Sequence, residues 1–155
     1  MKRRIFRTIT FFISILLLLS CNISAYAVEP RATNYIEVQS SGLSRTADTS
    51  FKIMFSVTGN QMLDQIGVYM IQLTRSTDQE TWYREAVFYS SDYPEFLRDD
   101  SWTHSGSITY TGTRGYYYRA NVVFYAKEGT DSERTSMYTN VIYIPQSGNG
   151  GRVAE

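Results

Sequence analysis

The chain has 155 residues, a mass of 17.8 kDa, and 15 basic and 15 acidic residues. This length corresponds to one domain and excludes multidomain machinery. Hydrophobic residues make up 43% of the chain and aromatic residues 15%, which excludes disorder for the middle of the chain. Tyrosine dominates the aromatics, with 13 Tyr against 8 Phe and 2 Trp, and tyrosine favours strands and partly exposed surfaces. We therefore expect a β-rich domain.

Residues 1–27 have the pattern of a secretory signal peptide. They begin with four basic residues, continue with the apolar stretch FFISILLLLS and end in Ala25-Tyr26-Ala27, a small-x-small cleavage pattern. The apolar run from Ile9 to Ile23 is shorter than the roughly 20 residues that span a bilayer, which disfavours a retained membrane anchor. Cleavage after Ala27 predicts a secreted protein.

A lipid anchor is the alternative fate of this segment. The sequence Leu18-Leu19-Ser20-Cys21 resembles the lipobox of bacterial lipoproteins, in which cleavage occurs just before the cysteine. Leu19 stands where a smaller residue is usual, so the Ala-x-Ala site is preferred. Acylation of Cys21 would instead produce a membrane-anchored lipoprotein.

Removal of the signal changes the charge balance. It takes away four basic residues and no acidic one, which leaves 11 basic against 15 acidic residues and a net charge of about −4. An acidic domain is poorly suited to binding nucleic acid or anionic lipid, so no nucleic-acid partner is expected. Membrane contact is expected only through the signal peptide or a lipid anchor. Cys21 is the only cysteine, so the mature protein has no disulfide.

The remainder of the chain is organised as a leader, one domain and a tail. Residues 28–33 lack periodicity, residues 34–145 alternate with period two between turn residues, and the Gly-rich tail 146–155 is expected to be disordered. This pattern predicts an all-β fold, an antiparallel two-sheet sandwich of about seven strands. The predicted strands are about 34–45, 50–58, 66–76, 82–89, 104–111, 116–127 and 134–144.

Two segments between these strands stand out. Residues 59–64 are expected to turn the chain between the second and third strands. Residues 90–103 form an irregular stretch too long for an ordinary connection. In the second strand, alternation assigns one side to the core, formed by Phe51, Ile53, Phe55 and Val57.

The segment ITYTGTRGYYYRANVVFYA resembles the approach to the sixth strand of a fibronectin type III or immunoglobulin-like sandwich. The resemblance implies that Tyr110 fills an apolar position and Tyr116 the tyrosine corner, with its hydroxyl bonded back to the preceding loop. It also implies that Tyr118 and the alternate residues after it enter the core. The stretch IQLTRSTDQETWY is similar to a hairpin of such modules. The signature Cys and Trp of immunoglobulin domains are absent, which favours the fibronectin-like branch.

From about Glu29 to Pro145 the chain also resembles a group of small exported proteins of Gram-positive gut bacteria. The shared motifs are structural. This resemblance implies no activity, because a β-sandwich supports many functions.

Few residues are suited to catalysis or to metal binding. His104 is the one histidine and has no nucleophile motif beside it, so neither a catalytic triad nor a zinc site is expected, and no cofactor is predicted. The candidate acids all lie on the long irregular stretch. As a pair they would serve a small hydrolase of envelope polysaccharide, and as oxygen ligands they are weak calcium candidates. These acids are Asp92, Glu95, Asp99 and Asp100.

The sixth predicted strand carries the most informative surface. Opposite its core side it presents alternating residues rich in tyrosine, which could be bordered by Tyr69, Tyr138 and Tyr143. Flat tyrosines between Arg and Asn suit sugar stacking or protein docking. The alternative is that the 90–103 stretch, with Phe96 and Trp102, folds over this side and buries it. The presenting residues are Tyr117, Arg119, Asn121, Val123 and Tyr125.

The sequence therefore predicts a secreted, non-enzymatic binding module for a protein or glycan partner. No residue argues for a dimer, so a monomer is expected.

Overall fold

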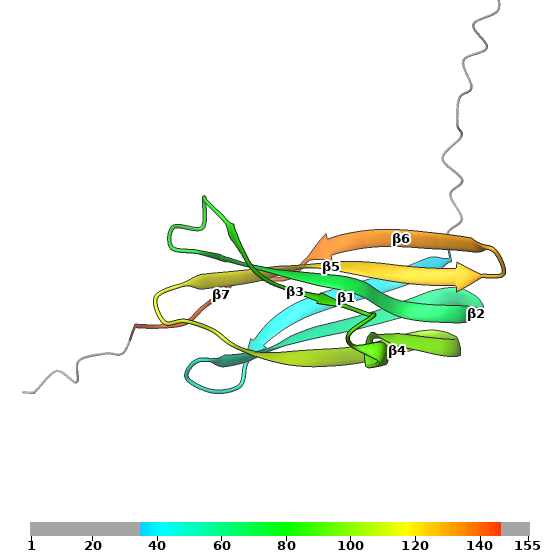
Figure 1. Cartoon of the computed structure of the whole chain (residues 1–155), viewed down its shortest axis with the longest axis horizontal. Helices are drawn as coiled ribbons and strands as arrows, with labels where there is room; N and C mark the ends of the chain where they lie inside the picture. The colour runs from blue at the N-terminus through cyan, green and yellow to red at the C-terminus, as the bar shows by residue number, and fades with distance from the viewer. Residues whose placement is uncertain (1–34, 147–155) are drawn as a thin grey trace, which may run out of the picture. The chain divides into compact units, whose positions relative to one another are not determined.

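The computed structural model describes residues 35–146, so the predicted signal peptide, leader and Cys21 lie outside the described residues, as does the tail from residue 147. Within the described part, seven strands form a single antiparallel sheet, which curls as a half-barrel (Figure 1). The prediction of an all-β antiparallel fold is confirmed. The elements are β1 (Ile36–Arg45), β2 (Ser50–Ser76), β3 (Tyr83–Tyr89), the 3₁₀ turn η1 (Pro94–Phe96), β4 (Leu97–Thr111), β5 (Tyr117–Glu128), β6 (Asp131–Tyr138) and β7 (Ile142–Tyr143).

Strand β2 unites the second and third predicted strands. The expected turn at 59–64 is a bend inside one strand of 27 residues, at which the pairing with β4 shifts between Thr58 and Leu63 (Figure 1). The bend remains within the sheet because its backbone keeps partners on both sides: Asn60 N–H donates to the Tyr35 carbonyl and Leu63 pairs with Ser101.

The curled sheet has two halves that share β2. The β1 half contains β1, β4 and residues 50–58 of β2, and the β5 half contains β3, β5, β6, β7 and residues 65–76 of β2. The inner sides of the two halves face one another and enclose the core. Across this core, the Phe51 and Tyr118 ring centroids lie 5.1 Å apart.

Alternation correctly identified the core. Phe51, Ile53, Phe55 and Val57 are at most 3% exposed, as are the inward-facing residues of β5. Burial of such side chains is the main source of stability in a domain without disulfides. The buried β5 residues are Tyr118, Ala120, Val122, Phe124 and Ala126.

The predicted irregular stretch 90–103 is shorter than expected. Strand β4 begins at Leu97, so residues 97–103 are paired with β2 rather than looped out. Gly67 makes this pairing so close that a Cβ added there would meet the Phe96 carbonyl oxygen and the Leu97 Cα. Glycine is therefore required at position 67.

Side chains, rather than a strand ladder, join β1 to β6 and to the segment after it. Glu133 Oε2 accepts from the backbone N–H groups of Tyr35 and Ile36 at 2.6 and 3.1 Å. The Asn140 amide accepts from Leu43 N–H at 2.7 Å and donates to the Leu43 carbonyl at 3.1 Å. The last predicted strand, 134–144, is divided into β6 and β7, and Asn140 occupies the gap. These bonds satisfy backbone groups at the outer edge of β1.

No helix within residues 35–146 has the length and apolar character needed to cross a membrane.

Candidate functional site

The outer side of β5 carries the predicted binding residues. Burial alternates along the strand: the inward residues are buried, and the five outward residues between them are half-buried. Cross-strand pairing places Tyr117 beside Tyr143, Asn121 beside Tyr138, and Tyr125 beside Arg134. Residues paired in this way point to the same side of a sheet. The structure therefore brings all five predicted residues to one surface.

Arg119 forms the centre of the first stack on this surface. Its guanidinium carbon lies 4.1 Å from the Trp82 ring centroid and 4.8 Å from that of Tyr138. Tyr138 is 58% exposed, so the outer member of the stack meets solvent. Cation–π contacts of this kind hold a flexible arginine in one place.

Arg134 forms the centre of the second stack. Its guanidinium carbon lies 3.7 Å from the Tyr69 ring centroid and 5.6 Å from that of Tyr125, and the two rings are 6.3 Å apart. At the other end of β5, the Tyr117 and Tyr143 rings lie 4.7 Å apart. Tyr69, Tyr138 and Tyr143 thus border this surface, as expected. We call it the Tyr/Arg face, and its members are Tyr69, Trp82, Tyr117, Arg119, Asn121, Val123, Tyr125, Arg134, Tyr138 and Tyr143.

Two polar atoms on the Tyr/Arg face have no hydrogen-bond partner among the described residues. They are Nε of Arg119, a donor, and Oδ1 of Asn121, an acceptor. Both atoms are shielded by the surrounding side chains, and both belong to residues on the same side of β5. Shielded polar atoms without partners are uncommon and call for an explanation.

The Tyr/Arg face is anchored at one corner by the turn before β3. Trp82 Nε1 donates to the Gln79 carbonyl at 2.9 Å. Asp78 Oδ1 organises the same turn by accepting from the backbone N–H groups of Glu80 and Thr81, and from the Ser76 hydroxyl. These bonds, foremost the one from Thr81, lower the pKa of Asp78. The turn thus positions the indole that stacks on Arg119.

The segment before β4 packs against the core instead of covering the Tyr/Arg face. Phe96 is 1% exposed, and its ring centroid lies 5.5 Å from that of Phe55 and 5.2 Å from that of Tyr93. Trp102, on β4, is 59% exposed. Phe96 is therefore a core residue and does not take the position over the tyrosines that the alternative required.

The candidate acids lie on the surface and are not part of a metal-binding cluster among the described residues. Asp92, Glu95, Asp99 and Asp100 are all exposed, and Asp99 Oδ1 accepts from Gln65 Nε2 at 2.8 Å. Among residues 35–146, no group of three or more acidic, His or Cys side chains could hold a metal ion.

His104 supports the segment before β4. Its Nε2 lies 2.8 Å from the Glu95 carbonyl oxygen, and its ring packs 5.7 Å from Phe55. These contacts fix the η1 segment against the sheet, which is a structural task.

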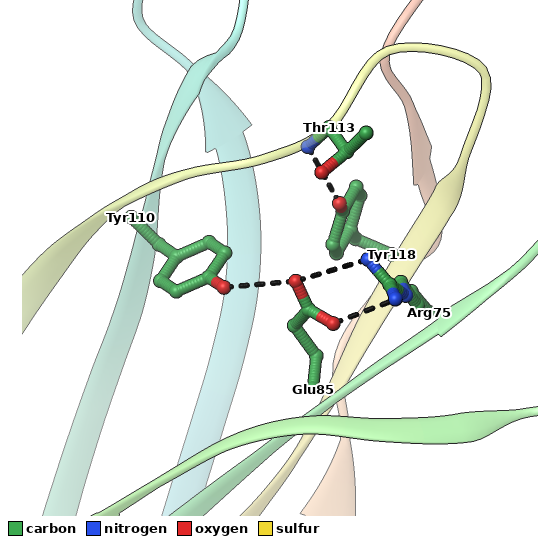
Figure 2. A network of polar contacts seen from close by, with 5 residues as sticks. All are labelled: Arg75, Glu85, Tyr110, Thr113 and Tyr118. Atoms are coloured by element: carbon green, nitrogen blue, oxygen red, sulfur yellow. Dashed lines mark hydrogen bonds and ion pairs between the residues drawn. The ribbon is translucent and has the colours of Figure 1, made fainter.

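Sequence reasoning missed a polar network on the inner side, near the ends of β3 and β4. Glu85 accepts from the Tyr110 hydroxyl at 3.0 Å and forms an ion pair with Arg75 Nε at 3.0 Å (Figure 2). Arg75 in turn lies over the Tyr116 ring, 4.7 Å from its centroid. The network links β3 to β4, which are not neighbours in the sheet. Burial, followed by the bond to Glu85, raises the pKa of Tyr110 to about 12.

The predicted tyrosine corner needs a correction. The hydroxyl that bonds back to the preceding loop belongs to Tyr118, which accepts from Thr113 N–H at 2.7 Å (Figure 2). Tyr118 points inward and is fully buried, whereas Tyr116 precedes β5 and stacks under Arg75. Tyr110 packs against Phe51 at 5.7 Å, as its predicted apolar position requires.

The outer side of the β1 half is chemically different, and sequence reasoning did not single it out. Cross-strand pairing brings short hydroxyl side chains together on β1, β2 and β4, around Lys52 and Met54. Two shallow depressions of about 290 and 360 Å³ lie along these strands. We call this surface the Ser/Thr face, and its hydroxyl residues are Ser40, Ser44, Ser56, Thr58, Thr103, Ser105, Ser107 and Thr109.

No protein-family model matches the chain, and no curated protein matches it. Among solved structures, the chain is similar to the sporulation control protein Spo0M from Bacillus subtilis, with 13% sequence identity and a TM-score of 0.37. The match covers 65% of this chain and 48% of Spo0M.

Proposed function

We propose that the protein is an exported, non-enzymatic binding module that acts at or beyond the cell envelope through its Tyr/Arg face. The observation that carries this proposal is the pair of stacks centred on Arg119 and Arg134, in which solvent-accessible rings are already held in place. Pre-positioned aromatic and arginine side chains lose little conformational entropy when a partner binds. Export is supported by the pattern of residues 1–27, and acylation at Cys21 remains the alternative route to the envelope.

The proposed fold is a fibronectin type III-like sandwich in which the two halves of the curled sheet serve as the two layers. It is supported by the shared core between these halves and by the bond from the Thr113 backbone to the Tyr118 hydroxyl. Such sandwiches commonly present one sheet surface or its loops to a partner.

Retention on purified, insoluble cell-envelope material tests the binding function. We expect residues 28–155 to be retained, and the Tyr117→Ala, Tyr125→Ala double variant to be lost to the wash. The matched control is the Ser56→Ala, Ser107→Ala double variant on the Ser/Thr face, which should be retained like the wild type. Equal retention of all three proteins would overturn the assignment of this face. Circular dichroism of each variant shows that the fold is intact.

Export is tested on the native protein by intact mass and N-terminal sequencing of medium and membrane fractions. An N-terminus at Val28 in the medium supports secretion. An acylated Cys21 in the membrane fraction would replace secretion with lipid anchoring.

A further inference from the structure

We propose that the ligand of the Tyr/Arg face is an anionic polysaccharide. This inference rests on the proposed binding function and names the chemical class of the partner.

Charge on the Tyr/Arg face is of one sign. The four cross-strand rows that contain Arg119, Asn121, Val123 and Tyr125 hold three arginines and no aspartate or glutamate. This absence is informative because the mature chain as a whole carries an excess of acidic residues. The rows are Arg84–Thr74–Arg119, Val87–Gln72–Asn121–Tyr138, Tyr89–Met70–Val123–Ser136 and Leu97–Gly67–Tyr125–Arg134.

Two of the three arginines, Arg119 and Arg134, stack on rings. Arg119 lies between Trp82 and Tyr138, and Arg134 lies on Tyr69. A guanidinium that stacks through its flat side keeps its N–H edge available to oxygen atoms and prefers planar groups such as carboxylates. The face therefore offers oriented positive charge to an anion.

The side chains of the Tyr/Arg face supply a mixed set of charged, polar and aromatic groups. The stacked guanidinium groups of Arg119 and Arg134 can donate to carboxylate or sulfate oxygens, and the tyrosine hydroxyls can donate to or accept from sugar hydroxyls. Tyr138 and Tyr143 are 58% and 39% exposed and present rings to the apolar sides of sugar units. A polysaccharide with acidic groups supplies all of these chemistries together.

The size of the surface fits a polymer. Arg119 and Tyr125, the β5 members of the two stacks, are six residues apart on one strand, which corresponds to roughly 20 Å. A chain that lies along β5 would meet an arginine and an aromatic ring at both ends of this distance. The combination of three arginines with exposed rings suits an anionic glycan, whose acidic groups pair with guanidinium and whose sugar units pack on aromatic rings.

The test measures binding of mature protein to two pairs of polymers by affinity electrophoresis and calorimetry. The anionic probes are polygalacturonate and dextran sulfate, and their uncharged counterparts are fully methyl-esterified polygalacturonate and dextran. We expect binding to at least one anionic probe, at least tenfold weaker binding to its uncharged counterpart, and weakening with added salt. Arg134→Gln should weaken binding about tenfold, as expected for loss of a charged hydrogen bond.

Lys52→Gln is the matched control, because it removes one positive charge from the Ser/Thr face and should leave binding unchanged. If Arg134→Gln and Lys52→Gln weakened polymer binding equally, binding would depend on the net charge of the protein rather than on the Tyr/Arg face, and the proposal would be overturned. Binding to neither anionic probe, or equal binding to the uncharged polymers, would also overturn it. Tighter binding to a single-stranded oligothymidylate would assign the face to nucleic acid instead. The envelope-retention test stands apart, so a failed polymer test with intact, tyrosine-dependent retention refutes only the ligand class.

Discussion

The two outer faces of the curled sheet are built on the same strand and yet differ completely in chemistry. Strand β2 places Lys52, Met54, Ser56 and Thr58 on the Ser/Thr face and Gln72 and Thr74 on the outer side of the β5 half. These residues alone would make both faces ordinary polar surfaces. The difference comes from the neighbours: β1 and β4 add short hydroxyl side chains, whereas β5 and β6 add tyrosines and arginines that stack.

Alternation along a strand identifies its outward side, but the cross-strand partners determine what that side can bind. On the Ser/Thr face, neighbouring hydroxyls such as those of Thr58 and Thr103 lie 3.3 Å apart, and short side chains leave the surface shallow. On the Tyr/Arg face, long side chains from different strands support one another. Five predictions test this contrast, beginning with the core that both faces share.

The largest effect is expected from the core. Phe55 lies under the β1 half and Phe124 under the β5 half, and both are nearly or fully buried. Truncation of either one to Ala should cost about 3–5 kcal/mol of unfolding free energy through the cavity it leaves. Since one core joins the halves, both should lose their structure in a single transition. Replacement of one tryptophan at a time leaves either Trp82 or Trp102 as the fluorescent probe, so that chemical denaturation can be followed in each half separately. If Phe55→Ala shifted the unfolding transition seen by Trp102 and not the one seen by Trp82, the halves would not unfold together.

A smaller loss is expected at the link between β1 and the segment after β6. Asn140→Ala removes both hydrogen bonds to the backbone of Leu43. We expect a cost of about 1–2 kcal/mol, because two backbone groups at the edge of β1 lose their partner but can still reach water. Hydrogen exchange should show faster exchange of the Leu43 amide, and unchanged protection there would refute the link.

A third, smaller effect is expected at the Tyr118 hydroxyl, which bonds back to the preceding loop. Tyr118→Phe should cost about 1 kcal/mol, because the Thr113 N–H loses its acceptor. Tyr116→Phe keeps the ring under Arg75 and should cost less. Urea denaturation of the two variants distinguishes them, and a larger loss for Tyr116→Phe would restore the original assignment.

The faces themselves should respond unequally to substitution. Arg119→Gln breaks the stack with Trp82 and Tyr138 and should lower stability by about 0.5–1 kcal/mol. Lys52→Gln on the Ser/Thr face should change it by less than about 0.5 kcal/mol, as is usual for a surface side chain. Thermal unfolding of the pair measures the contrast directly. Equal shifts would mean that the stacks add nothing to the folded state.

The last effect is confined to alkaline solution. The pKa of Tyr110 is about 12 in the folded protein, against an ordinary value of 10.0. At a pH between these two pKa values, the Tyr110 hydroxyl keeps its proton in the folded protein but has lost it in the unfolded chain. The free energy of unfolding should therefore fall as the pH rises from 10 towards 12. Tyr110→Phe has no such proton and should show a shallower decline over this range. Parallel declines in denaturation midpoint would contradict the proposed cause.

Sequence reasoning found β5 well because its alternation is local. It missed the continuity of β2, because Gly59 and its polar neighbours have turn composition and only the distant β4 keeps the bend within the sheet. Likewise, the contact between Trp82 and Arg119 depends on how β3, β2 and β5 pair, which no short motif encodes.

One part of the site was within reach of the sequence. Strands β5 and β6 are joined by the two-residue turn Gly129-Thr130, and Gly129 has a φ of 58°. Glycine in a two-residue turn is a hairpin signal, and it sets the register of the whole pair. Counting back from this turn places Tyr125 opposite Arg134, as the structure does. The predicted last strand, 134–144, included Arg134 but left its cross-strand partner unassigned.

The continuity of β2 also determines when the fold can form during synthesis. Its partners include β4 and β5, with pairs such as Ser50 and Thr111 or Ser76 and Tyr117 that are distant in sequence. Folding that depends on such contacts is slow, because the intervening chain must close before they are gained. The complete sheet therefore cannot form until β4 and β5 are available, which is compatible with the proposed export of the chain before it folds.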